Sequence, residues 1–228
     1  RPAGQQAELG KRSSVELVLH VGSEVGLYRD GMHFPEATSV RPATRADLGE
    51  VLDILGDAFT DDPVVSWVTP KTQYARYAFE LTIPFCLAHG YTDIAADGSG
   101  AASWLPPGVA LASPVTPRVL LKGLMEYGPG SLLRALATLL QTQKRHPKED
   151  FYYLFSIGAL RSARGRGVGS ALIREGLARC DADHMPAYLE SSNVKNLPFY
   201  RKHGFEVVDE LRLAMNGPTL WLMWRPAR

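Results

Sequence analysis

The sequence has little cysteine, almost no net charge and no long apolar run. Cys86 and Cys180 are its two cysteines in 228 residues, too few for a disulfide framework. Its 25 Lys and Arg are balanced by 24 Asp and Glu, so the basic excess that nucleic-acid binding requires is missing. No apolar run approaches the roughly 18 residues of a membrane helix, and no signal-peptide pattern opens the chain. We therefore expect a cytoplasmic protein with neither nucleic-acid nor membrane partners.

Metal chemistry is also not indicated. The six histidines are scattered, without the short spacing that ligand pairs show, and no cysteine pair accompanies them. We expect no metal site. Apolar residues make up 45% of the chain, which is enough to bury a sizeable core.

The first 37 residues differ in pattern from the rest. Apolar and polar residues alternate over 15–21, a turn-like segment follows at 22–24, and a second short apolar run covers 25–28. This pattern predicts a hairpin. We expect an N-terminal extension over 1–37 and one domain over 38–228.

The spacing of apolar residues after residue 37 predicts alternating strands and helices. Helices are expected over 48–59, 74–89, 168–180 and 196–203, and strands over 39–41, 91–96, 101–105, 151–160, 186–190, 205–209 and 219–224. A helical insertion at about 109–149 is broken at 128–130, and its leucines predict one buried face. This order predicts an α/β (α+β) fold, a mixed sheet with helices on both faces.

The most informative segment is a glycine-rich loop between a predicted strand and a predicted helix. Gly165, Gly167 and Gly169 stand at alternate positions, so successive backbone N–H groups can converge on an anion. The helix that follows adds the positive end of its dipole. Three arginines stand nearby: Arg161, Arg164 and Arg166. The segment suits a pyrophosphate.

Two common pyrophosphate loops do not fit this spacing. A P-loop requires a lysine after its last glycine, and none is present. The dinucleotide fingerprint requires G-x-G-x-x-G, whereas this loop reads G-x-G-x-G, although Glu190 lies about 20 residues further on. A nucleotide-binding module stays open as an alternative.

Two motifs resemble the GNAT superfamily of acetyl-CoA-dependent N-acyltransferases. Arg164, Gly167 and Gly169 match its R-x-x-G-x-G motif, and residues 196–205 match its N-x-x-x-Y-x-x-x-G-F segment. The resemblance is greatest to puromycin N-acetyltransferase and its relatives, through residues 146–149, 188–192, 196–200 and 217–218. It implies a GNAT-type sheet of about six to seven mostly antiparallel strands, splayed between the two central parallel strands.

The resemblance also implies a reaction and its residues. An amine attacks the thioester of acetyl-CoA directly in a ternary complex, with Glu190 as base and Tyr200 as acid. Asp57, Asp61 and Asp62 are weaker candidates for the base. A backbone N–H near Gly158 and Ala159, freed by an expected strand bulge, would hold the oxyanion. The cofactor would be bound by the main chain of Ile157 and Ala159, by the glycine loop and by Asn193 or Asn196. These cofactor residues are Ile157, Gly158, Ala159, Arg164, Gly165, Arg166, Gly167, Val168, Gly169, Ser170, Asn193, Asn196 and Tyr200.

The acceptor is expected to be the primary amine of a small molecule, held by aromatic side chains. The candidates are Phe59, Trp67, Tyr77 and Tyr152. A protein or peptide N-acetyltransferase and a non-catalytic acyl-CoA sensor are the alternatives. The resemblance leaves open which amine is used, whether puromycin is a substrate, and whether the protein is a monomer or a homodimer.

Overall fold

The computed structural model describes residues 38–71, 73–111 and 116–228. The hairpin predicted at 15–28 lies outside these residues. Every element described below belongs to the unit Pro35–Arg228.

The described residues form a seven-stranded mixed sheet in the order β1-β2-β3-β4-β5-β7-β6. Only β4 and β5 are parallel; the other neighbours are antiparallel. This arrangement confirms the predicted GNAT-type sheet. The strands are β1 Val40–Pro42, β2 Tyr91–Ala95, β3 Gly100–Leu105, β4 Tyr152–Ala159, β5 Ala187–Ser191, β6 Glu206–Arg212 and β7 Thr219–Arg225.

The central strands β4 and β5 diverge after a short stretch of pairing. They pair only at Tyr152 and Tyr153 of β4, which confirms the predicted splay. The N–H of Leu160 donates to Ser99 on the β3 side. Because backbone groups alternate in direction along a strand, the N–H groups of Ile157 and Ala159 face the gap between β4 and β5.

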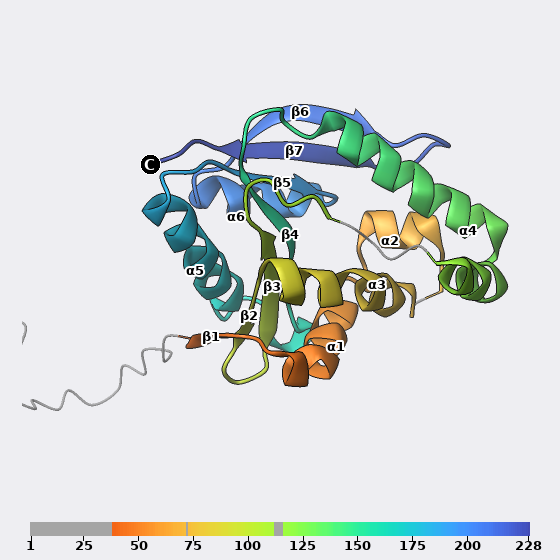
Figure 1. The fold of residues 1–228 in the computed structure, drawn as a ribbon, viewed down its shortest axis with the longest axis horizontal. Coiled ribbons are helices and arrows are strands. Elements are labelled where there is room, and N and C mark those ends of the chain that lie inside the picture. Colours follow the sequence, from red (N-terminus) through yellow and green to blue (C-terminus); the bar gives the residue numbers. More distant parts are fainter. Residues whose placement is uncertain (1–37, 72, 112–115) are drawn as a thin grey trace, which may run out of the picture. The chain divides into compact units, whose positions relative to one another are not determined.

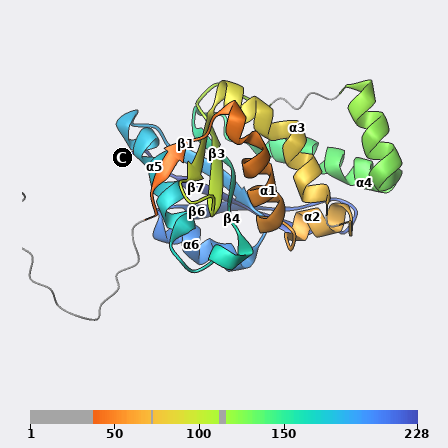
Figure 2. The ribbon, with the colours of Figure 1, turned by 90° about the horizontal axis from the view of Figure 1, so that it is seen from below.

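Helices cover both faces of the sheet, as Figures 1 and 2 show. On one face, α1 Leu48–Ala58 and α3 Tyr74–His89 pack on a cluster that includes Ala101. On the other, α5 Val168–Ala182 and α6 Leu197–Lys202 pack on a cluster that includes Ala102. Neighbouring residues of a strand point to opposite faces, so β3 separates two layers of core.

Capping side chains stabilise the N-termini of the helices near the site. Thr44 and Asp47 form a capping box, on the 3-10 turn Arg45–Asp47 that leads into α1. Asp62 caps the short helix α2 Pro63–Val68, which the spacing did not predict. Its Oδ1 accepts the N–H groups of Val64 and Val65, at 2.9 and 3.0 Å, and Pro63 suits the first helical position.

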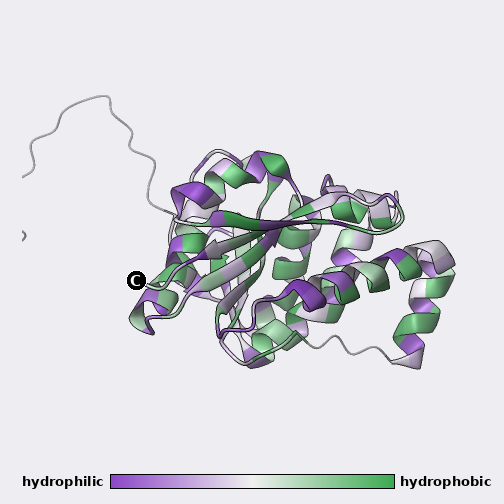
Figure 3. Cartoon of the chain, turned by 90° about the horizontal axis from the view of Figure 1, so that it is seen from above, coloured by the Kyte–Doolittle hydropathy of each residue, from purple (hydrophilic) through white to green (hydrophobic). Residues whose placement is uncertain are grey.

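The insertion forms α4 Pro117–Arg145, which is broken at Gly128 (φ +81°) as predicted. The predicted buried face was wrong. Leu133 and Leu140 are each 57% exposed, and only Gly123 and Ser131 of this helix are buried. Figure 3 shows apolar residues on both parts of α4. The helix packs mainly against α2, and Arg145 near its end pairs with Asp209 of β6. The exposed leucines therefore face no core.

The bulge predicted beside Gly158 lies earlier in β4. Gly158 pairs regularly with Ala101 of β3, and Phe155 is the extra residue between Leu154 and Ser156. A Cβ atom at Gly158 would lie 2.6 Å from that of Ala58. This glycine therefore permits the close approach of α1 to β4.

Candidate active site

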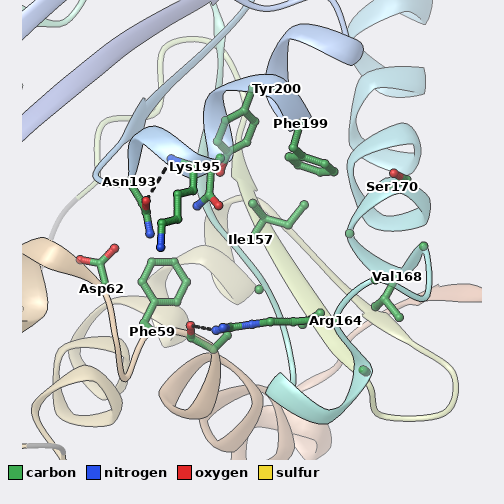
Figure 4. A pocket seen from close by; sticks show the side chains of 18 of the residues that line it. Phe59, Asp62, Ile157, Arg164, Val168, Ser170, Asn193, Lys195, Phe199 and Tyr200 are labelled. Atoms are coloured by element: carbon green, nitrogen blue, oxygen red, sulfur yellow. Dashed lines mark hydrogen bonds between the residues drawn. The ribbon is translucent and has the colours of Figure 1, made fainter.

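A cavity of about 620 Å³ lies where β4 and β5 separate, and Figure 4 shows its side chains. Four segments of the chain supply its lining. The residues are Ala58, Phe59, Asp61 and Asp62 after α1; Ile157, Gly158 and Ala159 of β4; Ala163, Arg164, Gly165, Gly167, Val168, Gly169 and Ser170 of the loop and α5; and Asn193, Lys195, Asn196, Phe199, Tyr200 and Lys202 around α6.

The glycine loop brings unpaired backbone donors to this cavity. Gly165 and Gly167 have φ angles of +79° and +86°, which residues other than glycine rarely adopt. Helix α5 begins directly after Gly167 and no side chain caps it. The N–H groups of its first residues, Val168 to Ser170, have no intrahelical partner. Such a helix start fits the diphosphate of coenzyme A.

One of the three predicted arginines lines the cavity. Arg164 donates from Nη2 to the carbonyl oxygen of Ala58 at 3.0 Å. Arg161 instead binds Asp57, through its backbone N–H at 2.7 Å and its Nε at 2.9 Å. Arg166 is exposed and does not line the cavity. Of the three arginines, Arg164 is the one that adds its charge to the cavity wall, beside the start of α5.

Asp62 is the partly buried carboxylate of the cavity. Besides capping α2, it accepts a hydrogen bond from the Ser192 hydroxyl at Oδ2. Burial raises its pKa despite these hydrogen bonds. A carboxylate with a raised pKa accepts a proton more readily than an ordinary aspartate does.

Tyr200 lies at the same end of the cavity. It is 8% exposed and belongs to the core cluster beneath α5 and α6. Its pKa is raised first by burial and then by the negative charge of Asp62. The Tyr200 hydroxyl is therefore protonated at neutral pH.

Glu190 does not line this cavity. One carboxylate oxygen accepts the Tyr153 hydroxyl at 2.6 Å, and the other lies 3.0 Å from Nε2 of His146. The side chain is 8% exposed. Both of its oxygens are thus engaged between β4 and the end of α4.

Among the four predicted acceptor-binding aromatics, Phe59 lines the cavity and the other three do not. The guanidinium of Arg134 lies over the ring of Trp67, 5.6 Å from its centre. Tyr77 donates to the carbonyl oxygen of Val119 at 3.1 Å. The Tyr152 hydroxyl donates to Asp183 at 2.5 Å, on the face covered by α5. These three side chains connect elements of the fold.

Sequence reasoning missed Lys195, Phe199 and Lys202. Phe199 packs on Gly169, because a Cβ there would lie 3.5 Å from its ring. Asn193 accepts the N–H of Lys195 at 3.0 Å and so caps the turn that carries this lysine. Figure 4 shows Lys195 between Asn193 and Phe59. Its signal in the sequence is the Asn-x-Lys spacing, which predicts a turn but gives no direction for the side chain.

Two further observations concern the described part of the chain. No helix there is both long and apolar enough to cross a bilayer. No group of three or more His, Cys, Asp or Glu there is arranged to hold a metal ion.

Comparison with known proteins gives three kinds of similarity. Residues 130–205 match the model of the acetyltransferase (GNAT) family. An uncharacterised N-acetyltransferase of Schizosaccharomyces pombe is 27% identical over 168 residues, which is 66% of this chain and 67% of that protein. The crystal structure of a histone acetyltransferase HPA2 and related acetyltransferase from Corynebacterium glutamicum has a TM-score of 0.64 and 29% identity, over 83% of this chain and 96% of that one.

A more distant structure shares the fold. Arylalkylamine N-acetyltransferase 2 from Aedes aegypti has a TM-score of 0.61 and 13% identity, over 83% of this chain and 99% of that chain. The finer resemblance to puromycin N-acetyltransferase is not shown by these findings and stays a prediction. The matched segment contains the glycine loop and all of α6. Together, the family model, the relatives and the fold support a GNAT-type acetyltransferase.

Proposed function

We propose that this protein transfers the acetyl group of acetyl-CoA to the primary amine of a small molecule, by direct attack in a ternary complex. One observation carries the proposal. The uncapped start of α5 and the gap between β4 and β5 open into the same cavity. Backbone donors suited to a diphosphate and a gap wide enough to separate two strands thus lie side by side, which supports the proposal.

The residues of the cavity fit coenzyme A in two ways. The N–H groups of Val168, Gly169 and Ser170 hold the diphosphate. The N–H groups of Ile157 and Ala159 face the gap and hydrogen-bond the extended pantetheine as an added strand would. When bound, acetyl-CoA supplies an acetyl group on a thioester that an unprotonated amine can attack.

The amine must lose a proton, since an alkylammonium has a pKa of about 10. Glu190 is the base expected from the sequence, but its oxygens are engaged away from the cavity. Asp62 lines the cavity, and its raised pKa increases its proton affinity. We therefore assign proton removal to the Asp62 carboxylate.

Tyr200 carries the acid role. Its hydroxyl proton is retained at neutral pH and lies on the cavity side of α6. A thiol has a pKa of about 8.5 and an ordinary tyrosine about 10, so full proton transfer to a departing thiolate is uphill by ~2 kcal/mol before burial is counted. The raised pKa of Tyr200 makes the transfer still less favourable. The Tyr200 hydroxyl therefore acts mainly by donating a hydrogen bond.

A small acceptor suits the lining of the cavity. Phe59 offers an aromatic face, and Asp61 and Asp62 offer negative charge for an amine. The structure from Aedes aegypti is that of an arylalkylamine N-acetyltransferase, which makes arylalkylamines the first class to try. Puromycin belongs in the same panel because of the resemblance in sequence.

The test mixes the purified protein with acetyl-CoA and a panel of arylalkylamines, polyamines, puromycin and a peptide with a free N-terminus. Release of free thiol with at least one small amine, and less with the peptide, is the expected result. Binding of acetyl-CoA without release for every amine would favour the sensor. Thermal-shift measurements with coenzyme A and with ATP test the nucleotide-binding alternative, since equal stabilisation by both ligands would favour a nucleotide-binding module.

A further inference from the structure

A second cavity, of about 330 Å³, lies between α5, α6 and the end of β7. Its charged lining is strongly cationic although the whole chain carries a formal charge of +1. The residues with titratable side chains are Arg174, Asp181, Lys202, His203, Arg225 and Arg228. Four permanent cations thus face one carboxylate.

Arg225 lies deepest in this group. Its side chain is 2% exposed, and its one acidic partner is Asp181, with Nη2 2.9 Å from Oδ2 and Nη1 2.8 Å from Oδ1. Its Nε is buried and has no hydrogen-bond partner among the described residues. A buried donor without a partner is costly, so this nitrogen indicates an incomplete site.

A second guanidinium lies close to this nitrogen. A Cβ atom at Gly204 would stand 2.6 Å from Nη2 of Arg228 and 3.5 Å from Nε of Arg225. Two guanidiniums therefore meet beside the same glycine. Like charges repel strongly where water is partly excluded, and an anion between them removes that cost.

The remaining cations have no competing partner. Arg174 and Lys202 make no ion pair with any described residue. The pKa of His203 is lowered by burial and then by the charges of Arg174 and Lys202. The cations from α5, α6 and β7 thus act on one small volume.

We propose that this cavity binds a phosphate dianion, either free or as a small monoester. Guanidinium groups pair with phosphate oxygens through two parallel hydrogen bonds, and at least three such groups line the walls and floor. The site is separate from the coenzyme A cavity and shares only Lys202 with it. The proposal does not depend on acetyl transfer.

The test is calorimetric titration of the full chain, saturated with coenzyme A, with inorganic phosphate at constant ionic strength. Glycerol phosphate is titrated in parallel; tighter binding of this ester would identify the ligand as a monoester, and equal binding as free phosphate. Arg174→Gln is expected to lower the affinity for phosphate about tenfold, because it removes one charge-assisted hydrogen bond. Arg174 is exposed, so this variant is expected to fold.

Arg212→Gln is the matched control, because Arg212 is exposed at the far end of β6 and outside this cavity. It is expected to leave phosphate affinity unchanged. If both variants lowered the phosphate affinity equally, the loss would come from the change in net charge alone, and the proposal would be overturned. The absence of phosphate binding, or its abolition by coenzyme A, would also overturn it. As a second readout, phosphate should raise the pKa of His203 in an NMR titration, and less so in Arg174→Gln.

Discussion

Asp62 and Glu190 are both carboxylates near the splay of the sheet, and their neighbours give them different surroundings. Asp62 lines the cavity while it caps α2 and accepts the Ser192 hydroxyl. Glu190 is held by Tyr153 and His146 outside it. Burial raises the pKa of Asp62, which suits a proton acceptor.

The first prediction is that Asp62→Asn lowers kcat/KM about 100-fold or more, the range of a lost general base. Asparagine still caps a helix, so α2 should persist. A base acts only when ionised, so activity should fall as pH drops through the raised pKa of Asp62, and this acid limb should vanish in the variant. Profiles of kcat/KM against pH for the original chain and the variant measure the loss of activity and the acid limb together. A larger loss in Glu190→Gln would return the role of base to Glu190.

The second prediction is that Tyr200→Phe slows turnover by about 10- to 100-fold without abolishing it. The lost hydrogen bond to a developing charge is worth roughly 1.5–3 kcal/mol, and a thiolate can depart unaided. Phenylalanine keeps the ring that packs beneath α6. Single-turnover kinetics give the rate, and unchanged turnover would reduce Tyr200 to a packing role.

At the level of elements, the loop and α5 act as one unit. Gly165 and Gly167 turn the chain through positive φ, and α5 starts without a capping side chain. A Cβ at Gly169 would meet the ring of Phe199 at 3.5 Å, an ordinary van der Waals distance. Positive φ therefore favours glycine at 165 and 167, and the turn they make leaves the first N–H groups of the helix free.

The third prediction concerns Gly167→Ala. At φ +86° an added Cβ costs roughly 1–2 kcal/mol, so the loop should shift and coenzyme A affinity should fall about tenfold. Gly130→Ala is the control, because Gly130 in α4 has open space around it and no positive φ. Calorimetric titration with coenzyme A compares them. Equal affinity in both variants would show that the loop does not hold the diphosphate.

On the scale of the whole molecule, the sheet is held between two helical layers, and an ion pair ties one of them down. Arg179 of α5 donates to Asp93 of β2 from both terminal nitrogens, at 2.6 and 2.8 Å. Asp93 is 1% exposed. The pair fixes α5, whose start lines the proposed coenzyme A site, to a strand two positions from β4.

The fourth prediction is that Arg179→Met lowers the free energy of unfolding by about 3–5 kcal/mol, because it leaves a buried carboxylate unpaired. Adding Asp93→Leu should recover much of that loss, since an apolar pair needs no partner. Denaturant unfolding measures both variants. If the single variant were as stable as the original chain, the Asp93 carboxylate would have to be solvated.

Local chemistry made much of this fold predictable. The capping box of Thr44 and Asp47, the break at Gly128 and the spacing of Gly165 and Gly167 are short-range requirements, and a turn or helix start depends on a few neighbouring residues. The order of predicted strands and helices likewise predicted the mixed sheet. These features lie within a few residues of the signals that predict them.

Contacts between distant segments were beyond such reasoning. The leucines of α4 show that periodicity predicts an apolar face but not whether anything covers it. Asp62 reaches Ser192, 130 residues away, and Arg161 turns to Asp57 instead of the loop. Which carboxylate and which arginine line the cavity depends on how the layers pack, because charges and hydrogen bonds act through space and not along the chain.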